Sequence, residues 1–330
     1  MKKIFILGNG IDWCEKSLIG FRKYENVRII NDRFLVKNKI ARFLIKRQYS
    51  KTLNKRFNVP MKGIWYGQFC KKIELSNDDN CLLIYDHNPL GGDFQFLMYV
   101  RRKYPKIKLA YIFTNIIKHS AAHEMNYVDN LNNIYNIVFA FDLEDAKNYN
   151  FAYSPLIYDA DPSYKKEEKE SKENLVFYVG QAKDRLPGLF SCFEKLKSLG
   201  IKTDFHIANV KEEDMKYSGE IEYNKFMTYE ECVSSIQRAT CLVDIIQGDS
   251  TGLTIKTCEA VCYDKKLITT NKHVVEYPFY DPRFIKVIDS SNDIDESFFC
   301  NNKDVQYSEE GKRYFSADKF LERIEKGVNI

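Results

Sequence analysis

Residues 241–270 read CLVDIIQGDSTGLTIKTCEAVCYDKKLITT, and this stretch decides the fold. The apolar run Cys241–Ile246 is typical of a buried parallel strand, and the turn at 247–252 is rich in Gly, Ser and Thr. Residues 253–262 are typical of a helix, and a second apolar run follows at Lys266–Thr270. Strand, helix and strand in this order predict a parallel sheet with a right-handed crossover.

The same alternation of apolar runs and helical stretches extends through both halves of the chain. Further strands are expected at Lys3–Leu7, Cys81–Tyr85, Ile107–Phe113, Ile137–Phe141, Leu175–Val179, Lys202–Ile207 and Ile285–Ile288. Further helices are expected at 188–199, 228–237 and 316–326. A length of 330 residues predicts two domains at roughly 100–200 residues each. We expect a first domain at 1–158, a Lys/Glu-rich linker at 159–174, a second domain at 175–310 and a C-terminal helix within 311–330.

The cysteines and the N-terminus predict a cytoplasmic protein. The nine cysteines are scattered with no CxxC pair, which is typical of reduced thiols. The apolar run after Lys3 stops after four residues at Gly8, too early for an export signal. No apolar stretch approaches the roughly 20 residues that span a bilayer. We therefore expect a soluble or peripheral protein.

Two loops carry phosphate-binding signals. Gly8-Asn9-Gly10 begins like a dinucleotide fingerprint, but Trp13 stands at the third glycine position, which argues against an NAD-type enzyme. The better candidate is 247–256, where a strand, a small-residue turn that starts at Gln247 and a helix N-terminus follow one another. Glu259, one turn into that helix, is placed to accept from ribose hydroxyls. A capped connection and a solvated glutamate explain the same spacing equally well.

Four segments carry a resemblance to a known family. Residues 252–260 (GLTIKTCEA) and 265–271 (KKLITTN) resemble the donor-binding segment of bacterial GT-B glycosyltransferases, and 141–150 (FDLEDAKNYN) and 177–185 (FYVGQAKDR) are similar to the same group. The subgroup that builds capsular and lipopolysaccharide (O-antigen) repeat units is the most similar one that we can name. The likeness is strong in the C-terminal half and weak before residue 81. It implies an α/β, GT-B architecture: two Rossmann-like domains whose parallel sheets face a central cleft, with the C-terminal helix returning to the first domain.

The resemblance also implies which residues bind the donor. A nucleotide sugar with a UDP, GDP, TDP or CMP group would bind the second domain through its diphosphate and ribose. The residues implied are Gly252, Leu253 and Thr254 at the diphosphate, Glu259 at the ribose, and Lys183 and Arg185, after Gly180, and Lys256 as added positive charge. Lys183 and Arg185 also read as an ordinary basic loop. No metal or other cofactor is expected. Thr251 stands where many retaining enzymes of this fold carry a first glutamate, which favours inversion.

Inversion requires a general base that takes the proton of the acceptor hydroxyl. Asp12 follows the first strand, and Asp86 and His87 follow the strand Cys81–Tyr85. Each candidate also reads as a turn or capping residue, and the sequence does not choose among them. His119 and His123 could share a helix face as metal ligands, but a surface histidine pair is the preferred interpretation.

The charge of the chain is uneven. A net charge of +4 argues against a general nucleic-acid binder, yet 33–73 holds twelve Lys or Arg and no Asp or Glu. Val36, Ile40, Phe43 and Leu44 fall on one helical face there. Such a basic amphipathic helix suits an anionic membrane surface and a lipid-linked acceptor. The residues predicted to form this surface are Lys46, Arg47, Lys51, Lys55 and Arg56. The apolar stripe would equally pack on the first domain's sheet.

Two classes of function remain open. The first is a nucleotide-sugar-dependent glycosyltransferase that acts on a lipid-linked or oligosaccharide acceptor in bacterial surface polysaccharide synthesis. The second is a non-catalytic nucleotide-sugar-binding or scaffolding subunit of a glycan-assembly complex. Binding of a nucleotide sugar with turnover separates the first class from the second.

Overall fold

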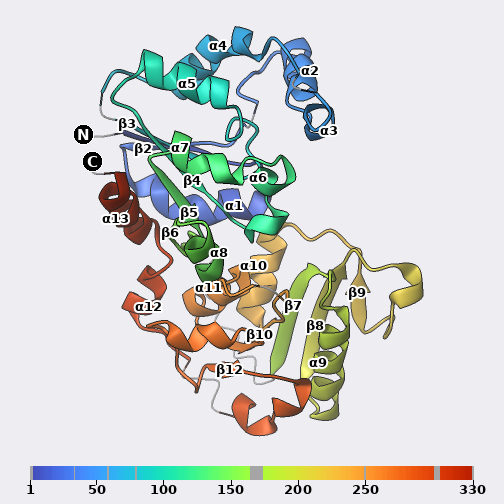
Figure 1. Ribbon diagram of the computed structural model, residues 1–330. Coiled ribbons are helices and arrows are strands. Elements are labelled where there is room, and N and C mark those ends of the chain that lie inside the picture. Colours follow the sequence, from blue (N-terminus) through green and yellow to red (C-terminus); the bar gives the residue numbers. More distant parts are fainter. Residues whose placement is uncertain are drawn as a thin grey trace. The chain divides into compact units, whose positions relative to one another are not determined.

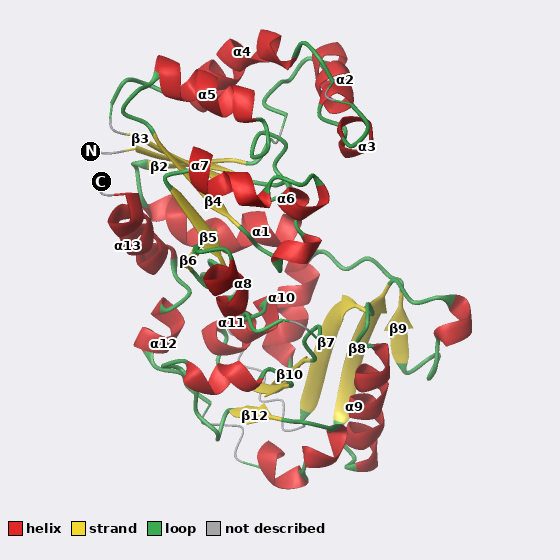
Figure 2. Ribbon diagram, viewed as in Figure 1, coloured by secondary structure: helices red, strands yellow, loops and turns green. Residues whose placement is uncertain are grey.

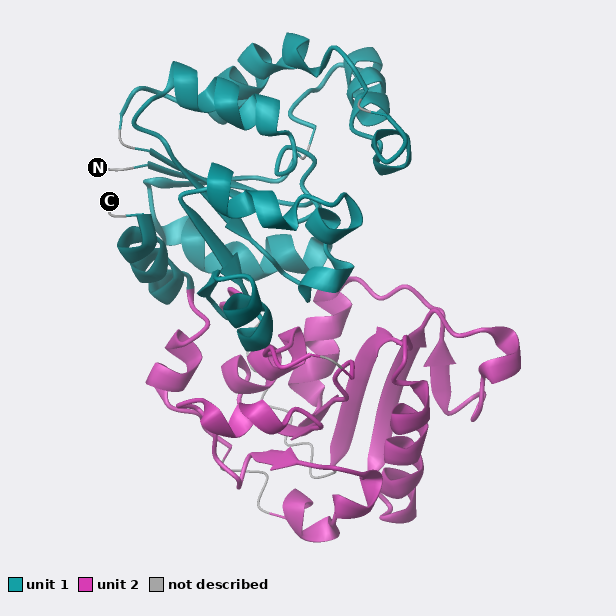
Figure 3. Ribbon diagram, viewed as in Figure 1, with its two compact units in different colours: residues 1–155, 317–330 teal, residues 156–316 magenta. Residues whose placement is uncertain are grey.

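The computed structural model describes residues 3–32, 34–57, 59–78, 80–163, 174–248, 250–300 and 305–328. The chain forms two compact units, Met1–Pro155 with Ala317–Ile330 and Leu156–Ser316 (Figure 3). The predicted linker, 159–174, lies largely outside the described residues.

Unit 1 is built on a six-stranded parallel sheet with the strand order β2-β1-β3-β4-β5-β6 (Figure 1). The strands are β1 (Lys3–Leu7), β2 (Val27–Ile30), β3 (Asn80–Tyr85), β4 (Lys108–Ile112), β5 (Ile137–Ala140) and β6 (Ala152–Tyr153). Four of these strands were predicted. β2 and β6 were not predicted, because they are short edge strands and give only a weak apolar signal.

The helices of unit 1 cover both faces of its sheet. They are α1 (Asp12–Ser17), α2 (Lys39–Gln48), α3 (Lys51–Asn54), α4 (Tyr66–Ile73), α5 (Phe94–Lys103), α6 (Ala121–Glu124), α7 (Leu131–Ile134), α8 (Leu143–Asn148) and α13 (Ala317–Val328), with 3₁₀ turns η1 (Leu18–Lys23), η2 (Lys62–Trp65), η3 (Ile117–His119) and η4 (Val128–Asn130). Phe5 and Leu7 pack in one cluster with Phe69 of α4 and Phe96 of α5. Since alternate strand residues point to opposite faces, Ile4 and Ile6 point to the other face.

The C-terminal helix α13 belongs to unit 1, which confirms its predicted return to the first domain. Its Phe320 ring meets the edge of Phe21, with 6.3 Å between the ring centroids. The Tyr24 hydroxyl donates to Asp318 Oδ1 at 2.5 Å. α13 also packs so closely on β5 that a Cβ added at Gly327 would lie 2.0 Å from Ile137 Cδ1.

Unit 2 holds a second six-stranded parallel sheet, with the order β12-β11-β10-β7-β8-β9. The strands are β7 (Leu175–Gln181), β8 (Lys202–Ala208), β9 (Ile221–Tyr223), β10 (Cys241–Asp244), β11 (Lys266–Thr269) and β12 (Ile285–Val287). The three-residue edge strand β9 was not predicted. The helices are α9 (Leu186–Ser198), α10 (Tyr229–Arg238), α11 (Ile255–Cys262) and α12 (Glu309–Arg313), with short 3₁₀ turns at Glu212–Asp214 (η5), Lys272–Glu276 (η6), Ser291–Asp293 (η7) and Glu296–Phe299 (η8) (Figure 2).

Candidate functional site

The order in which the chain adds strands to the sheet of unit 2 reverses between β7 and β10. From β7 the chain builds outward through β8 and β9 on one side, and from β10 through β11 and β12 on the other. At such a reversal the connections leave to opposite faces of the sheet, and a crevice opens at the carboxyl ends of the two central strands. The predicted donor-binding residues follow these two strands, so the topology brings them to one edge.

Hydrogen bonds tie together the two loops that follow β7 and β10. Lys183 Nζ donates to Gln247 Oε1 at 2.8 Å, and Arg185 Nη1 donates to the Ile245 carbonyl at 3.2 Å. Desolvation, with Arg185 nearby as the next cause, lowers the pKa of Lys183. An anion between the two side chains would relieve their mutual repulsion.

Gly180 is required at the end of β7 for a steric reason. A Cβ at this position would lie 2.8 Å from the Tyr178 hydroxyl oxygen, closer than real Cβ contacts. Tyr178 is 1% exposed and is fixed in the core of unit 2, so the ring has little room to move. Among the described residues, the buried Tyr178 hydroxyl and the buried Nε of Arg185 have no hydrogen-bond partner. Spare hydrogen-bonding capacity therefore lies beside the predicted donor site.

A buried carboxylate that the sequence analysis did not single out organises the turn before α11. Asp244 is the last residue of β10 and is 2% exposed. Its Oδ2 accepts from the hydroxyls of Thr254, at 2.8 Å, and Thr257, at 3.3 Å. Burial raises the pKa of Asp244. Its sequence signal was an acidic residue inside the otherwise apolar run CLVDII.

The turn itself is held by capping and by a buried asparagine. The Thr254 hydroxyl caps α11 by accepting from the backbone N–H groups of Lys256 and Thr257, at 3.1 and 3.4 Å. Asn271 Nδ2 donates to the Gly252 carbonyl at 3.0 Å, and Leu253 is fully buried. The capped connection considered from the sequence is therefore present. The contact of these residues with a diphosphate stays a prediction.

Lys256 and Glu259 form a buried ion pair. Lys256 Nζ lies 2.6 Å from Glu259 Oε2, and the two residues are 7% and 1% exposed. Glu259 therefore balances the charge of Lys256 in this structure, and the contribution of Lys256 near the phosphates stays a prediction. The alternative of a solvated glutamate is wrong. The ribose role of Glu259 stays a prediction.

In unit 1 the strand order also reverses, between β1 and β3, and the candidate bases follow these two strands. Asn88 Nδ2 donates to the Gly8 carbonyl at 2.6 Å, so the loop after β3 is joined to the loop after β1. Asp12 begins α1 and is exposed. Asp86 and His87 follow β3 directly. Because β1 and β3 pair in parallel, the candidates that follow these strands lie at one edge of the sheet, and their role as base stays a prediction.

The buried Asp86 carboxylate contacts Tyr111, Ala121 and His87. It is fully buried, and its Oδ1 accepts from the Tyr111 hydroxyl at 2.6 Å and from the backbone N–H of Ala121 at 3.2 Å. His87 Nε2 lies 3.2 Å from Asp86 Oδ2. His87 has a left-handed backbone, with φ of 66°. A carboxylate with these partners holds an imidazole in one tautomer and orientation.

The other ring nitrogen of His87 meets a lysine. Lys51 Nζ lies 3.1 Å from His87 Nδ1 and 2.9 Å from Glu124 Oε2. The tautomer that satisfies both contacts carries its proton on Nε2 and accepts at Nδ1. The hydrogen bond from Lys51 lowers the pKa of Glu124. Lys51 was predicted on the basic membrane surface; its charge is engaged by Glu124 and His87, and its contact with a membrane stays a prediction.

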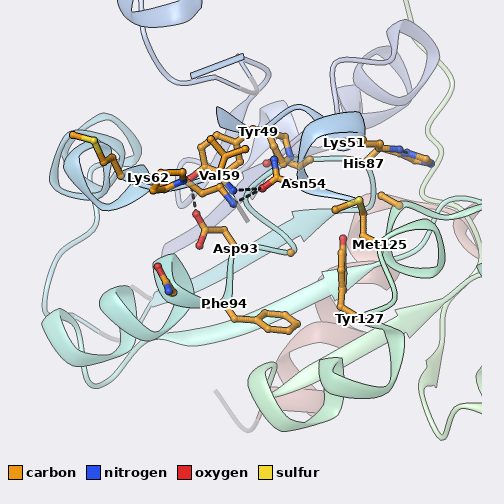
Figure 4. Close-up of a pocket in the computed structure, with 17 residues that line it drawn as sticks. Tyr49, Lys51, Asn54, Val59, Lys62, His87, Asp93, Phe94, Met125 and Tyr127 are labelled. Carbon is orange, nitrogen blue, oxygen red and sulfur yellow. Dashed lines mark hydrogen bonds between the residues drawn. The ribbon is translucent and has the colours of Figure 1, made fainter. Parts of the chain in front are cut away.

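His87 and Lys51 line a cavity of about 630 Å³ within unit 1 (Figure 4). Figure 4 shows His87 and Lys51 at one end, Lys62 at the other, and the rings of Phe94 and Tyr127 along one wall. The cavity is lined by Tyr49, Lys51, Asn54, Val59, Pro60, Met61, Lys62, His87, Asn88, Pro89, Gly92, Asp93, Phe94, Gln95, Ala121, Met125 and Tyr127. Asp12 is not among these residues. The sequence did not predict the cavity, because its lining comes from five separate segments.

Two side chains fix the polar floor of this cavity. Asp93 caps α5 by accepting from the Phe96 N–H at 3.1 Å, and it also accepts from the hydroxyls of Tyr49, at 2.5 Å, and Tyr66, at 2.9 Å. Lys62 Nζ donates to Asn54 at 2.8 Å, and burial lowers the pKa of Lys62. The cavity therefore presents cationic donors and aromatic rings on a rigid frame.

Among the described residues, no group of three or more His, Cys, Asp or Glu could hold a metal ion. His119 and His123 lie on two different short helices, η3 and α6, and both are exposed. None of the described helices is both long enough and apolar enough to cross a bilayer.

Comparisons with known proteins support the fold. No protein-family model matches the chain, and no curated protein sequence matches it. Among solved structures, an alpha-glucosyltransferase in complex with UDP and a 13-mer DNA matches with a TM-score of 0.55 at 13% identity, over 99% of this chain and 100% of that chain. An alpha,alpha-trehalose-phosphate synthase (UDP-forming) from Burkholderia vietnamiensis matches with a TM-score of 0.54 at 9% identity, over 100% of both chains. The predicted GT-B fold is therefore confirmed.

Proposed function

We propose that this protein is a nucleotide-sugar-dependent glycosyltransferase. The observation that carries the proposal is the pair of cations, Lys183 and Arg185, at the strand reversal of the second sheet in a GT-B fold. The donor is expected to be a UDP-, GDP-, TDP- or CMP-linked sugar. A third structural neighbour, an E. coli trehalose-6-phosphate protein with a TM-score of 0.51, is described as bound with UDP-2-fluoro glucose, which supports this choice of donor class.

The donor half of the proposal rests on charge and topology. The diphosphate would lie at the crevice beside Gly180, accept hydrogen bonds from Lys183 and Arg185, and displace the contact between Lys183 and Gln247. As the bond between the sugar carbon and the diphosphate oxygen breaks, its electron pair stays on the diphosphate. Two neighbouring cations stabilise that developing negative charge, so no metal is needed there.

For the general base we propose His87, oriented by Asp86. The acceptor hydroxyl would take the place of Lys51 at Nδ1, its proton would pass to Nδ1, and its oxygen would attack the sugar carbon. The Asp86 carboxylate would stabilise the imidazolium that forms. Asp86 itself is too deeply buried to reach a substrate, and Asp12 lies outside the cavity lining. Attack by the acceptor in one step inverts the configuration at the anomeric carbon of the sugar. This agrees with Thr251, which stands where many retaining enzymes of this fold carry a first glutamate.

For the acceptor we propose a lipid-linked oligosaccharide of bacterial surface polysaccharide synthesis. The aromatic rings of Phe94 and Tyr127 line the cavity and would pack against a sugar, and Lys51 and Lys62 would donate hydrogen bonds to a phosphate group. The assignment to capsular or O-antigen synthesis rests on the resemblance of 252–260 and 265–271. A non-catalytic subunit with the same fold is the alternative.

A donor panel tests the proposal. UDP, GDP, CMP and TDP sugars are scored for thermal shift and for slow hydrolysis of the donor. We expect one nucleotide to stabilise the protein and its sugar to be released. Binding without release would favour the non-catalytic alternative, and binding of none would overturn the donor site.

A second experiment tests the base. His87→Gln is expected to lower turnover by about 10²- to 10⁴-fold while the thermal shift with the donor stays unchanged. The matched control is His123→Gln, which changes an exposed histidine of the same unit. If His87→Gln keeps full turnover and Asp12→Asn loses it, the role of base passes to Asp12.

A further inference from the structure

The outer face of α2 is apolar. Ile40, Phe43 and Leu44 are 73%, 61% and 46% exposed, and the residue of α2 that is buried is Ile45. Val36 is buried, but it lies before the helix. The interpretation in which the stripe of Ile40, Phe43 and Leu44 packs on the sheet is therefore wrong, since these three side chains point to solvent.

A second apolar segment lies beside α2. Phe57, Met61 and Ile64 are also more than half exposed. Gln48, at the end of α2, donates to the Pro60 carbonyl at 3.2 Å and accepts from the Trp65 indole N–H at 2.6 Å. These bonds join α2 to the segment 59–65, and we call the six exposed residues Ile40, Phe43, Leu44, Phe57, Met61 and Ile64, with the cations around them, the α2 surface. It holds six of the ten large hydrophobic residues that are exposed among the described residues.

The same surface carries positive charge without acidic residues. Lys39, Lys46, Arg47, Lys55 and Arg56 are exposed, and 33–73 contains no Asp or Glu. Among the described residues, none of Lys39, Arg47 and Arg56 forms an ion pair. In contrast, Arg42 is engaged with Asp32 at 3.2 Å. The α2 surface therefore combines exposed aliphatic and aromatic side chains with exposed cations.

We propose that the α2 surface binds an anionic lipid bilayer, with Ile40, Phe43, Leu44, Phe57, Met61 and Ile64 entering the interface and the surrounding cations contacting lipid phosphates. Apolar side chains gain free energy when they leave water for the acyl boundary, and each Lys or Arg near an anionic surface adds to binding. A nucleic acid would match the cations but would leave the exposed aliphatic groups in water. An anionic bilayer satisfies both features.

The position of the cavity extends this proposal. Met61 belongs to the α2 surface and also lines the cavity that holds His87. An acceptor anchored in the bilayer would therefore reach the cavity at the edge of the bound surface. This last step rests on the proposed function, whereas binding to the bilayer does not.

Flotation with vesicles tests the surface. The whole chain is mixed with vesicles of phosphatidylcholine alone and of phosphatidylcholine with about one third phosphatidylglycerol. We expect binding to the second kind only, and weaker binding as salt rises, because salt screens exposed charges. No binding to the anionic vesicles, or equal binding to both kinds, overturns the proposal.

Paired substitutions separate charge from insertion. Arg47→Ser with Arg56→Ser is expected to weaken binding about 30-fold, at about 1 kcal/mol for each cation. Phe43→Ser with Leu44→Ser is expected to weaken it about tenfold or more. The matched controls change exposed residues of unit 2, namely Lys211→Ser with Lys225→Ser for charge and Val275→Ser for apolar area. These controls are expected to stay within twofold of the unmodified chain.

The remaining outcomes each decide the question. Unchanged binding in the Phe43 and Leu44 variant overturns insertion. An α2 surface that drives self-association, or that binds an RNA oligonucleotide more tightly than vesicles, assigns it to a second copy or to a nucleic acid instead. Donor thermal shifts on the same variants keep the two proposals apart: vesicle binding without donor binding removes only the function, and donor binding without vesicle binding removes only the surface.

Discussion

The buried pair of Lys256 and Glu259 makes a sharp prediction about stability. Glu259→Ala removes the carboxylate 2.6 Å from Lys256 Nζ and leaves an ammonium group in a site that is 7% exposed. Removing one partner of a buried ion pair costs about 3–5 kcal/mol, because the remaining charge is uncompensated. For a domain of this size, 1 kcal/mol shifts the melting temperature by about 2–4 °C. We therefore expect Glu259→Ala to lower the melting temperature of unit 2 by about 6–20 °C.

The chain offers a way to follow the two units separately. Its two tryptophans, Trp13 and Trp65, both belong to unit 1, so tryptophan fluorescence reports that unit, and far-ultraviolet circular dichroism reports both. The matched control is Glu222→Ala, which breaks an exposed pair with Lys225 at the same i,i+3 spacing and should cost less than about 1 kcal/mol. Lys256→Met combined with Glu259→Leu should recover most of the loss, because apolar groups can replace a buried pair.

Two results would refute this reasoning. One is a melting temperature for Glu259→Ala within about 2 °C of the unmodified chain. The other is a double variant no more stable than the single one, which would mean that the loss does not come from the unpaired ammonium. Nucleotide affinity is also measured on Glu259→Gln, at a temperature well below its melting: weakened binding in the folded variant would support the predicted ribose contact.

Two further predictions concern other named contacts. Gly180→Ala should weaken nucleotide binding and lower stability, because the alanine Cβ would lie 2.8 Å from the Tyr178 hydroxyl oxygen. Adding Tyr178→Phe to this variant should recover part of the binding and of the stability, as measured by thermal shift. The Lys286 hydrogen bond lowers the pKa of Asp295 to about 2, so the pair stabilises the fold above the unfolded pKa near 4 and loses that effect as pH falls toward 2. Because Asp295 is exposed to solvent, Asp295→Asn should lower the free energy of unfolding by less than about 1 kcal/mol at pH 7. In urea titrations, the difference in unfolding free energy between the variant and the unmodified chain should shrink between pH 5 and pH 3.

The central strands of the two sheets could be predicted from the sequence, because buried parallel strands are continuous apolar runs. Lys3–Leu7 has the predicted bounds, and the strand that ends in Asp244 was expected from the run CLVDII. Edge strands such as Val27–Ile30 were not predicted, because a strand that pairs on one side only does not need to be apolar throughout. The candidate site was predictable only in part: the residues that follow β7 and β10 were named from the sequence, whereas the strand order that places those two strands side by side is seen only in the structure.

The sequence by itself determined two domains with parallel sheets, a basic loop with Lys183 and Arg185 after one strand, and a cationic stretch without acids at 33–73. Only the tertiary structure decided which charges are free. Lys51 pairs with Glu124 and Lys256 pairs with Glu259. The periodicity of helices and strands in the sequence does not by itself predict either ion pair. The tertiary structure also decided that the apolar stripe of α2 faces outward. Periodicity fixes which residues share a face, whereas the neighbours that cover a face are chosen by packing between segments far apart in the chain.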